Sequence, residues 1–527
     1  MASYKRLVLV AGIAVAAVAA TAVVPYGGVT AAPSPTVAKL KWDGESTIRN
    51  PGMGWMIYAE EFGSPLADAE EFWATVDPHV EEASVLYLRV PWSRLEPSEG
   101  RYAWDEDENY QRLVDGARER GLRLAFRVFV DSQHSHRQAT PQFVFDAGAV
   151  SYPALSNPEL HNPTIDDVIF REKFETFLAA FGAEYDDPAR VDFVDMNTVG
   201  WWGEMHSIPG LTEQTWTDTV QWLGTAYRNS FHSVLLALNI NPDNFGYQAV
   251  DEQFEAGAIM RRDSFGSTMW FSQQDKDDIA ARWSGSLLIA ENCYQSFTTR
   301  ETACDESFKP TRAMLERVVA DALDLRANYL DLRHPEDVVT WARDNPDLVE
   351  DFAVNGGYRI GPIEATLPAE VGTDGAELSV AWQNTGVGRM PNDNPQWDHK
   401  YKVAYALFDP DSAEPVRTVT SVADPGGWYS GQRYLDTVEL TSQGIPDGRY
   451  QLAAAIVDST RGGAPAVELG VNAQQRDGWV ILGEVSIGST QQGSRYWPLV
   501  ALVALAAVGC LGAWVIVSRC RPKVSSG

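Results

Sequence analysis

An apolar strand that runs into a carboxylate-bearing loop gives the first candidate for chemistry. The stretch VDFVDMNTVGWWGEMH, residues 191–206, holds Glu204, and a second acidic strand end, LLIAENCY, holds Glu291. Two carboxyl groups can divide the cleavage of a glycosidic bond. One is protonated to assist the leaving oxygen, and the other is ionised to attack or to position water. Burial beside a like charge is expected to raise the pKa of one of them. The alternative is a structural ion pair.

Both glutamates belong to a longer alternation of strand-like and helical segments. Segments such as 109–120, 170–185 and 215–230 have apolar residues three and four apart, as amphipathic helices require. Eight alternations predict an α/β fold, a (β/α)8 TIM barrel over residues 43–350, with Glu204 after the fourth strand and Glu291 ending the seventh. The predicted strands are Gly54–Tyr58, Val85–Val90, Leu122–Val130, Val191–Asn197, Val234–Asn239, Ala258–Arg262, Ser286–Glu291 and Asn328–Leu332.

The chain resembles the clan-A glycoside hydrolases at these positions. Residues 89–105, RVPWSRLEPSEGRYAWD, are similar to the second-strand segment of that clan, and the motif NPGMG, residues 50–54, also resembles a bacterial group of barrel proteins of unassigned function. The resemblance implies Glu204 as acid/base, Glu291 as nucleophile and Arg89 as a partner of the nucleophile. In clan A the acid/base directly follows an asparagine, whereas Glu204 lies seven residues past Asn197. Asp195 is therefore an alternative acid/base.

Other polar and aromatic residues near the predicted barrel mouth are candidates for binding sugar hydroxyls or stacking on pyranose faces. Any of them could instead be structural. The predicted substrate-binding residues are Arg89, Asp131, Asp195, Asn197, Trp201, Trp202, Asn241, Asp263, Trp270, Asn292 and Tyr294. The spacing of His134 and His136 admits a metal, but no third ligand is evident, so we predict neither a metal nor a cofactor.

The chain ends predict export and anchoring. Lys5 and Arg6 precede an apolar run, which is typical of a signal peptide, here over residues 1–31; an uncleaved anchor is the alternative. From Tyr358 onward, short alternating strands predict an antiparallel β-sandwich over residues 358–488. A polar linker, 489–496, leads to the apolar run 497–518, which is long enough for a transmembrane helix. The basic tail 519–527 is then cytoplasmic.

Charge and cysteine usage agree with an exported protein. The formal net charge of −30 repels phosphate backbones, so nucleic acid is excluded as a partner. Cys293 and Cys304 lie in the exported part and are expected to form a disulfide; two buried thiols are the alternative.

The sequence thus predicts a membrane-anchored, extracellular glycoside hydrolase that acts on a polysaccharide or oligosaccharide by a retaining mechanism. No Gly-rich phosphate loop, Gly-x-Ser-x-Gly elbow or Cys-x-x-Cys pair points to another class of enzyme. A catalytically silent barrel that binds envelope carbohydrate remains an alternative. A transglycosidase in envelope assembly is a further one, because it would share the same site.

Overall fold

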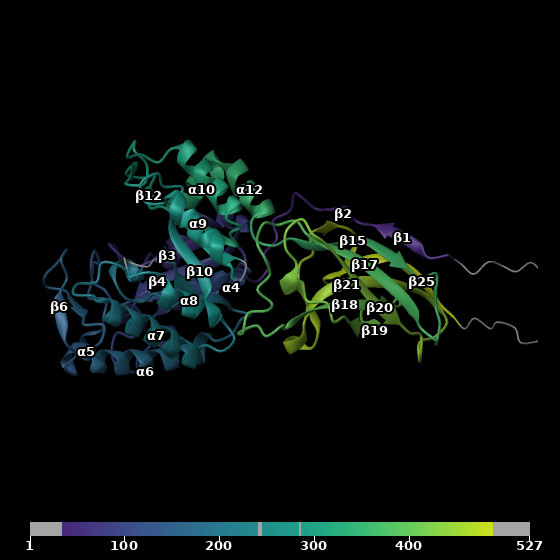
Figure 1. Ribbon diagram of the computed structural model, residues 1–527, viewed down its shortest axis with the longest axis horizontal. Helices are drawn as coiled ribbons and strands as arrows, with labels where there is room; N and C mark the ends of the chain where they lie inside the picture. Colours follow the sequence, from purple (N-terminus) through teal and green to yellow (C-terminus); the bar gives the residue numbers. More distant parts are fainter. Residues whose placement is uncertain (1–33, 241–244, 284–285, 489–527) are drawn as a thin grey trace, which may run out of the picture.

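The computed structural model describes residues 34–240, 245–283 and 286–488 (Figure 1). Eight parallel strands close into a barrel, which confirms the predicted fold class for this region. Each of the eight predicted strands overlaps one of the barrel strands. The barrel strands are β3 (Gly54–Glu60), β4 (Ala83–Pro91), β5 (Arg123–Phe129), β8 (Val191–Asp195), β9 (Leu235–Asn239), β10 (Ile259–Phe265), β11 (Leu288–Asn292) and β14 (Tyr329–Asp331).

Helices pack on the outside of the barrel through the outward-facing apolar residues of the strands. In α6 the buried Phe170, Phe174, Phe177 and Phe181 recur every three or four residues and form one apolar stripe. The side chain of Asp167 caps the first turn of this helix. The longer helices are α1 (Ala69–Val76), α4 (Glu108–Glu119), α6 (Val168–Tyr185), α7 (Glu213–Ser230), α8 (Gln248–Glu255), α9 (Gln273–Arg282), α10 (Arg312–Asp324), α11 (Pro335–Asp344) and α12 (Pro346–Asn355).

The barrel interior changes from apolar to charged along the strands. Tyr58 and Tyr87, in register on β3 and β4, belong to an apolar cluster that fills the barrel's middle. Two residues further along each strand, Glu60 and Arg89 are in register. Side chains alternate between the two faces of a strand, so these charged residues form the next interior layer, at the carboxyl ends where barrel active sites lie.

The C-terminal region is rich in strands and forms two sheets that pack on each other. One sheet has the order β1 (Thr36–Lys39), β15 (Ile360–Leu367), β17 (Ala376–Asn384), β20 (Arg433–Leu440). The other has the order β16 (Glu370–Val371), β25 (Trp479–Ile487), β21 (Gly448–Asp458), β18 (Tyr401–Phe408), β19 (Pro415–Thr420). The strand β1 comes from before the barrel, a pairing that the sequence reading did not predict.

The barrel and the two sheets share one continuous core. The cluster that fills the barrel also contains buried residues of both sheets, such as Trp382 and Tyr405. Asn328, which precedes β14, donates to the carbonyl oxygens of Gly52 (2.9 Å) and Arg389 (2.8 Å). These contacts lie at the amino ends of the barrel strands, so the barrel mouth opens away from the sheets (Figure 1).

The described residues leave several predictions aside. The signal peptide (1–31), the linker (489–496), the membrane span (497–518) and the tail (519–527) lie outside them, as does Asn241. Within the described ranges, no helix is both long and apolar enough to cross a membrane.

We expect Asn328→Ala to lower the free energy of unfolding by about 1–3 kcal/mol, because it leaves buried backbone carbonyls of the barrel and of the sheets without their donor. Urea unfolding should measure this loss. Asn355→Ala is the matched control, since the exposed Asn355 donates only to Asp351 within its own helix. Equal stabilities of the two variants would contradict the structural role of Asn328.

Candidate active site

Glu291 lies at the end of β11, with 1% of its side chain exposed, among four arginines. Arg333 Nη1 donates to Oε1 at 2.7 Å, and Arg261 Nη2 donates to Oε2. Arg89 Nη1 is 3.5 Å from Oε1, and Arg127 Nη2 is 3.5 Å from Oε2. Burial alone would raise the pKa of Glu291, but these guanidinium groups hold it well below its usual range. The carboxylate is therefore ionised.

Glu204 lies in the loop after β8 and shares two of these arginines. Its Oε1 accepts from Arg89 Nη2 at 2.8 Å and from Arg127 Nη1 at 3.3 Å, while its Oε2 is 3.3 Å from His206 Nε2. One pair of guanidinium groups thus bridges Glu204 and Glu291. The fold brings together the two carboxylates that the sequence analysis selected, although 87 residues separate them in the chain.

The ionisation of Glu204 differs from the expected one. Burial would raise its pKa, but Arg89, the hydrogen bond with His206 and Arg127 lower it to about 2. The expectation that a nearby like charge would leave one carboxyl of the pair protonated is wrong, because the arginines outweigh the repulsion from Glu291. At neutral pH, both carboxylates are charged.

Further charges complete the layer. Asp195, fully buried, accepts from the Tyr87 hydroxyl at 2.9 Å and from Arg127 Nε at 3.1 Å, and it lies 3.3 Å from Arg261 Nη1. Asp331 at the end of β14 accepts from the backbone N–H of Asn292, and burial raises its pKa to about 7. The charged layer at the carboxyl ends of the barrel strands is therefore a network of oppositely charged side chains.

Some predicted substrate-binding residues instead hold this network and the strands together. Asn197 is fully buried, donates to Asp195 at 2.7 Å and accepts from the Asn239 backbone at 2.8 Å. Asn292 is also buried and donates to the Asp331 carboxyl at 2.9 Å. Since Asp195 has no exposed surface, it has no direct access to a ligand in the barrel mouth.

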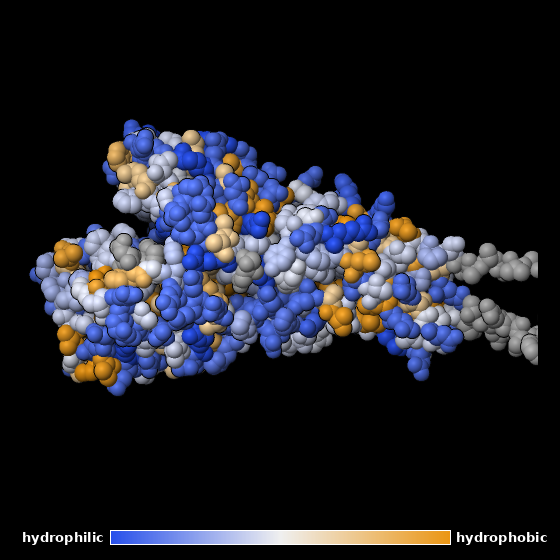
Figure 2. Space-filling model, viewed as in Figure 1, coloured by the Kyte–Doolittle hydropathy of each residue, from blue (hydrophilic) through white to orange (hydrophobic). Residues whose placement is uncertain are grey.

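Aromatic residues surround the charged layer. Trp201 and Trp202 are partly buried, and their ring centroids lie 5.8 Å apart. Trp270 and Tyr294 are 58% and 57% exposed, a degree of exposure that suits stacking on a ligand. Figure 2 shows a largely hydrophilic surface with apolar patches both at the end of the barrel where α5 (Gln142–Asp146) lies and over the C-terminal sheets.

The predicted disulfide between Cys293 and Cys304 is present. The backbone N–H of Cys293 donates to Phe265, and the carbonyl of Cys304 accepts from Thr268. The disulfide therefore closes part of the loop after β11, which carries Tyr294, and the two backbone hydrogen bonds join this loop to the end of β10 and to the loop after it, which carries Trp270.

Two of the predicted substrate-binding residues, Asp131 and Asp263, form close contacts with neighbouring protein groups. Asp131, 3% exposed, accepts from the Gln133 backbone at 2.7 Å, and burial raises its pKa to about 6. Asp263 pairs with the adjacent Arg262, which also contacts Asp275 at 3.1 Å.

The His134 and His136 pair does not extend to a metal-ligand set. His136 Nε2 is 2.8 Å from the buried Glu61, which also pairs with Arg94 and Arg137. Throughout the described part of the chain, no three His, Cys, Asp or Glu side chains are grouped so as to hold a metal ion.

Sequence reasoning missed Arg127, Arg261 and Arg333. A usable signal existed for the first two, because the strand RLAFRVF has one arginine in its interior and the strand IMRRDSF has two. A strand buried on both faces is normally a continuous apolar run, so such an arginine requires buried partners. Which acids those partners are depends on barrel closure.

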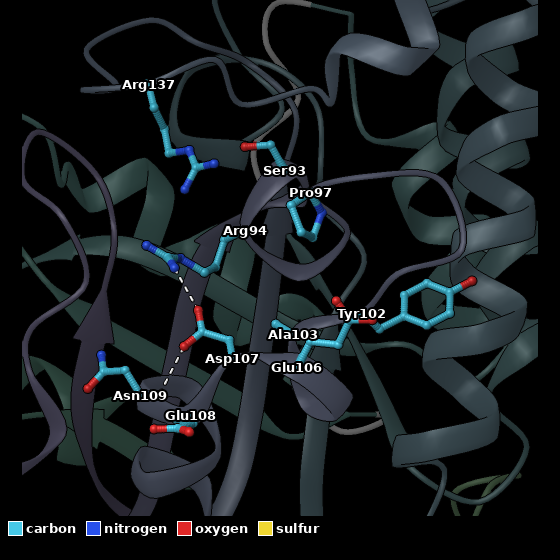
Figure 3. A pocket seen from close by; sticks show the side chains of 10 residues that line it. All are labelled: Ser93, Arg94, Pro97, Tyr102, Ala103, Glu106, Asp107, Glu108, Asn109 and Arg137. Atoms are coloured by element: carbon cyan, nitrogen blue, oxygen red, sulfur yellow. Dashed lines mark hydrogen bonds and ion pairs between the residues drawn. The ribbon is translucent and has the colours of Figure 1, made fainter.

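A cavity of about 430 Å³ lies beside the barrel rim (Figure 3), and neither Glu204 nor Glu291 lines it. Two of the polar residues that line it, Arg94 and Asp107, have structural contacts. Arg94 donates to Asp107 at 2.7 Å, and Asp107 caps α4 by accepting from the Asn109 backbone at 3.0 Å. None of the predicted site residues lines this cavity.

No family model matches the chain, and no curated protein matches it either. Similar solved structures include an endo-β-1,4-mannanase from Thermotoga petrophila, with 10% identity, TM-score 0.37 and coverage of 83% of this chain and 98% of that one. Endo-glycoceramidase II from Rhodococcus sp. has 12% identity, TM-score 0.38 and coverage of 74% and 99%. At these values the likeness carries no argument about activity.

We expect Glu204→Gln to destabilise the fold in a pH-dependent way. The pKa of Glu204 falls from 4.5 to about 2 on folding, so its ionic contacts stabilise fully above pH 4.5 and are lost as pH falls towards 2. The wild type should exceed the variant by on the order of 3 kcal/mol at pH 7, and by progressively less below pH 4.5. Urea unfolding across this range measures the difference; a difference independent of pH would contradict the assignment. Glu377→Gln, on the exposed face of β17, is the control.

Proposed function

We propose that this protein is a membrane-tethered, extracellular glycoside hydrolase that acts on a polysaccharide or oligosaccharide by a retaining double displacement. The observation that carries the proposal is the pairing of Glu204 and Glu291 through shared guanidinium groups, at the carboxyl ends of the fourth and seventh barrel strands. Barrel enzymes assemble their active sites from residues at this end of several strands.

In this mechanism Glu291 attacks the anomeric carbon, and the bond to the leaving oxygen breaks as that oxygen takes up a proton. Arg261 and Arg333 keep Glu291 ionised for the attack. Water then attacks the glycosyl ester and loses a proton to the group that supplied the first one. Trp201, Trp202, Trp270 and Tyr294 offer aromatic faces for the sugar rings.

A second candidate is a barrel that binds carbohydrate without cleaving it. The specific observation in its favour is the 1% exposure of Glu291 among its arginines, because a nucleophile has to reach the sugar. A transglycosidase would use the same residues and pass the glycosyl group to a sugar hydroxyl instead of water. Analysis of the products distinguishes hydrolysis, glycosyl transfer and binding without cleavage.

The fold is compatible with a tether. The outer ends of β1 and β25 lie close together, since Thr36 pairs with Leu367 and Ile487 pairs with Val371. Both segments leave the sheets at the end remote from the barrel mouth (Figure 1). A membrane span beyond residue 488 would therefore leave the mouth pointing away from the bilayer.

Glu291→Gln should lower hydrolysis by roughly 10⁴-fold or more, because it removes the nucleophile while keeping the shape of the side chain. The measurement begins with a screen of the purified region 34–488 against a glycan library, followed by NMR of the first-formed anomer. Glu377→Gln should retain full activity. A product of inverted configuration would indicate a single displacement instead of a double displacement. Binding without cleavage by the wild type would favour the catalytically silent barrel.

For the topology, protease added to intact cells should release the folded barrel and sheets into the medium, because the basic tail 519–527 favours the cytoplasmic side. Immunoblotting with antibodies against the sheets and against the tail measures the result. Protection of the sheets together with loss of the tail would reverse the orientation.

A further inference from the structure

The loop between β8 and α7 has an unusually costly backbone. Thr198, Trp202, Met205 and Ser207 all have positive φ angles, between 41° and 62°, although none is glycine. Each such residue costs free energy, and such residues cluster at functional sites where the surrounding structure holds them. Backbone hydrogen bonds from Met205 to Val199 (2.9 Å) and from Trp201 to the carbonyl of residue 206 (3.1 Å) close the loop.

The strained loop presents His206 beside Glu204. The ring nitrogen Nε2 is 3.3 Å from Glu204 Oε2, and Nδ1 is 2.8 Å from the Ser207 hydroxyl. The His206 side chain is 20% exposed, compared with 8% for Glu204 and 1% for Glu291. Among these three groups, His206 is the most accessible to a ligand in the mouth.

Acidic and aromatic side chains surround the His206 ring. The carboxylate of Glu204 contacts it directly, and the carboxyl group of Asp131 acts on it electrostatically. The Trp201 and Trp202 rings, at 6.2 Å and 5.6 Å between centroids, form its aromatic neighbours. Arg89 and Arg127 bind Glu204 Oε1, whereas His206 faces the other carboxylate oxygen, Oε2.

Glu204 itself is poorly suited to hold the proton that cleavage requires. Arg89 and Arg127 stabilise its ionised form, so protonating it would leave both guanidinium groups without their shared anion. An imidazole ring beside that carboxylate can carry a transferable proton at the same place without breaking these contacts.

We propose that His206, oriented by Glu204, is the proton donor and acceptor of the glycosidic cleavage. This inference rests on the proposed hydrolase function. In the first step, the proton that Nε2 shares with Glu204 Oε2 passes to the leaving oxygen, as the bond between that oxygen and the anomeric carbon breaks and the bond from Glu291 forms. In the second step, water attacks the anomeric carbon, its proton passes to the neutral imidazole, and Glu291 leaves as a carboxylate.

The test compares substrates that differ in their need for a proton. The full chain and its His206→Gln variant are assayed on methyl and on 2,4-dinitrophenyl glycosides of glucose, mannose and galactose. Loss of proton donation should lower cleavage of the methyl glycosides by roughly 10²–10⁴-fold. The formation of the glycosyl-enzyme from dinitrophenyl glycosides, measured as the burst of dinitrophenolate, should change by less than about tenfold, because this leaving group departs without a proton.

Two further variants make the test specific. Added imidazole should partly restore methyl glycoside cleavage to His206→Ala, which shows a missing proton carrier rather than a misfolded loop. The control variant His232→Gln changes an exposed histidine that precedes β9 at the opposite end of the barrel, and it should behave as wild type.

The outcomes separate the two proposals. Full activity of His206→Gln on methyl glycosides, or equal losses on both kinds of substrate without rescue by imidazole, overturns the role of His206 while the hydrolase remains. A wild-type protein that cleaves neither kind of glycoside and no glycan of the library overturns the proposed function and, with it, this inference.

Discussion

The burial of Glu291 among four guanidinium groups is the interaction on which the rest of the site depends. The arginines come from β4, β5, β10 and the segment after β14, so the network forms only when the barrel closes. Removing one partner from a buried ionic cluster typically costs 3–5 kcal/mol, because the charge left behind is unsolvated. In this barrel, the same ionic contacts therefore determine the geometry of the candidate site and stabilise the fold.

This network also determines what the paired carboxylates can do. Arg89 and Arg127 hold Glu204 and Glu291 close together but keep both ionised, which suits a nucleophile and opposes an acid. Under the proposed mechanism, Glu291 would therefore be the nucleophile, and a group other than Glu204 would supply the proton. If the barrel only binds, the same charges would contact the ligand.

The sequence was sufficient for the barrel but not for this network. Buried strands and amphipathic helices are local patterns, so all eight strands and the positions of Glu204 and Glu291 followed from periodicity. The partners of Arg261 could not be predicted, because Glu291 and Asp195 meet it only through closure of the barrel. The pairing of β1 with β15 is equally non-local, since more than 300 residues separate them. The pKa of Glu204 is lowered rather than raised because of contacts with arginines that the sequence pattern did not predict.

The placement of charge within the barrel explains why the sheets and the site occupy opposite ends. The apolar half of the barrel interior needs a cover, and the sheets supply it by extending one core from Tyr329 to Trp382. The charged half cannot be covered by an apolar surface without stranding charges such as those of Arg89 and Glu60, so it is left for water or a polar ligand. Because the amino ends are closed by the sheets, ligands can approach this layer only from the carboxyl ends of the strands. The polarity of the barrel interior thus determines which end of the barrel is open to a polar ligand.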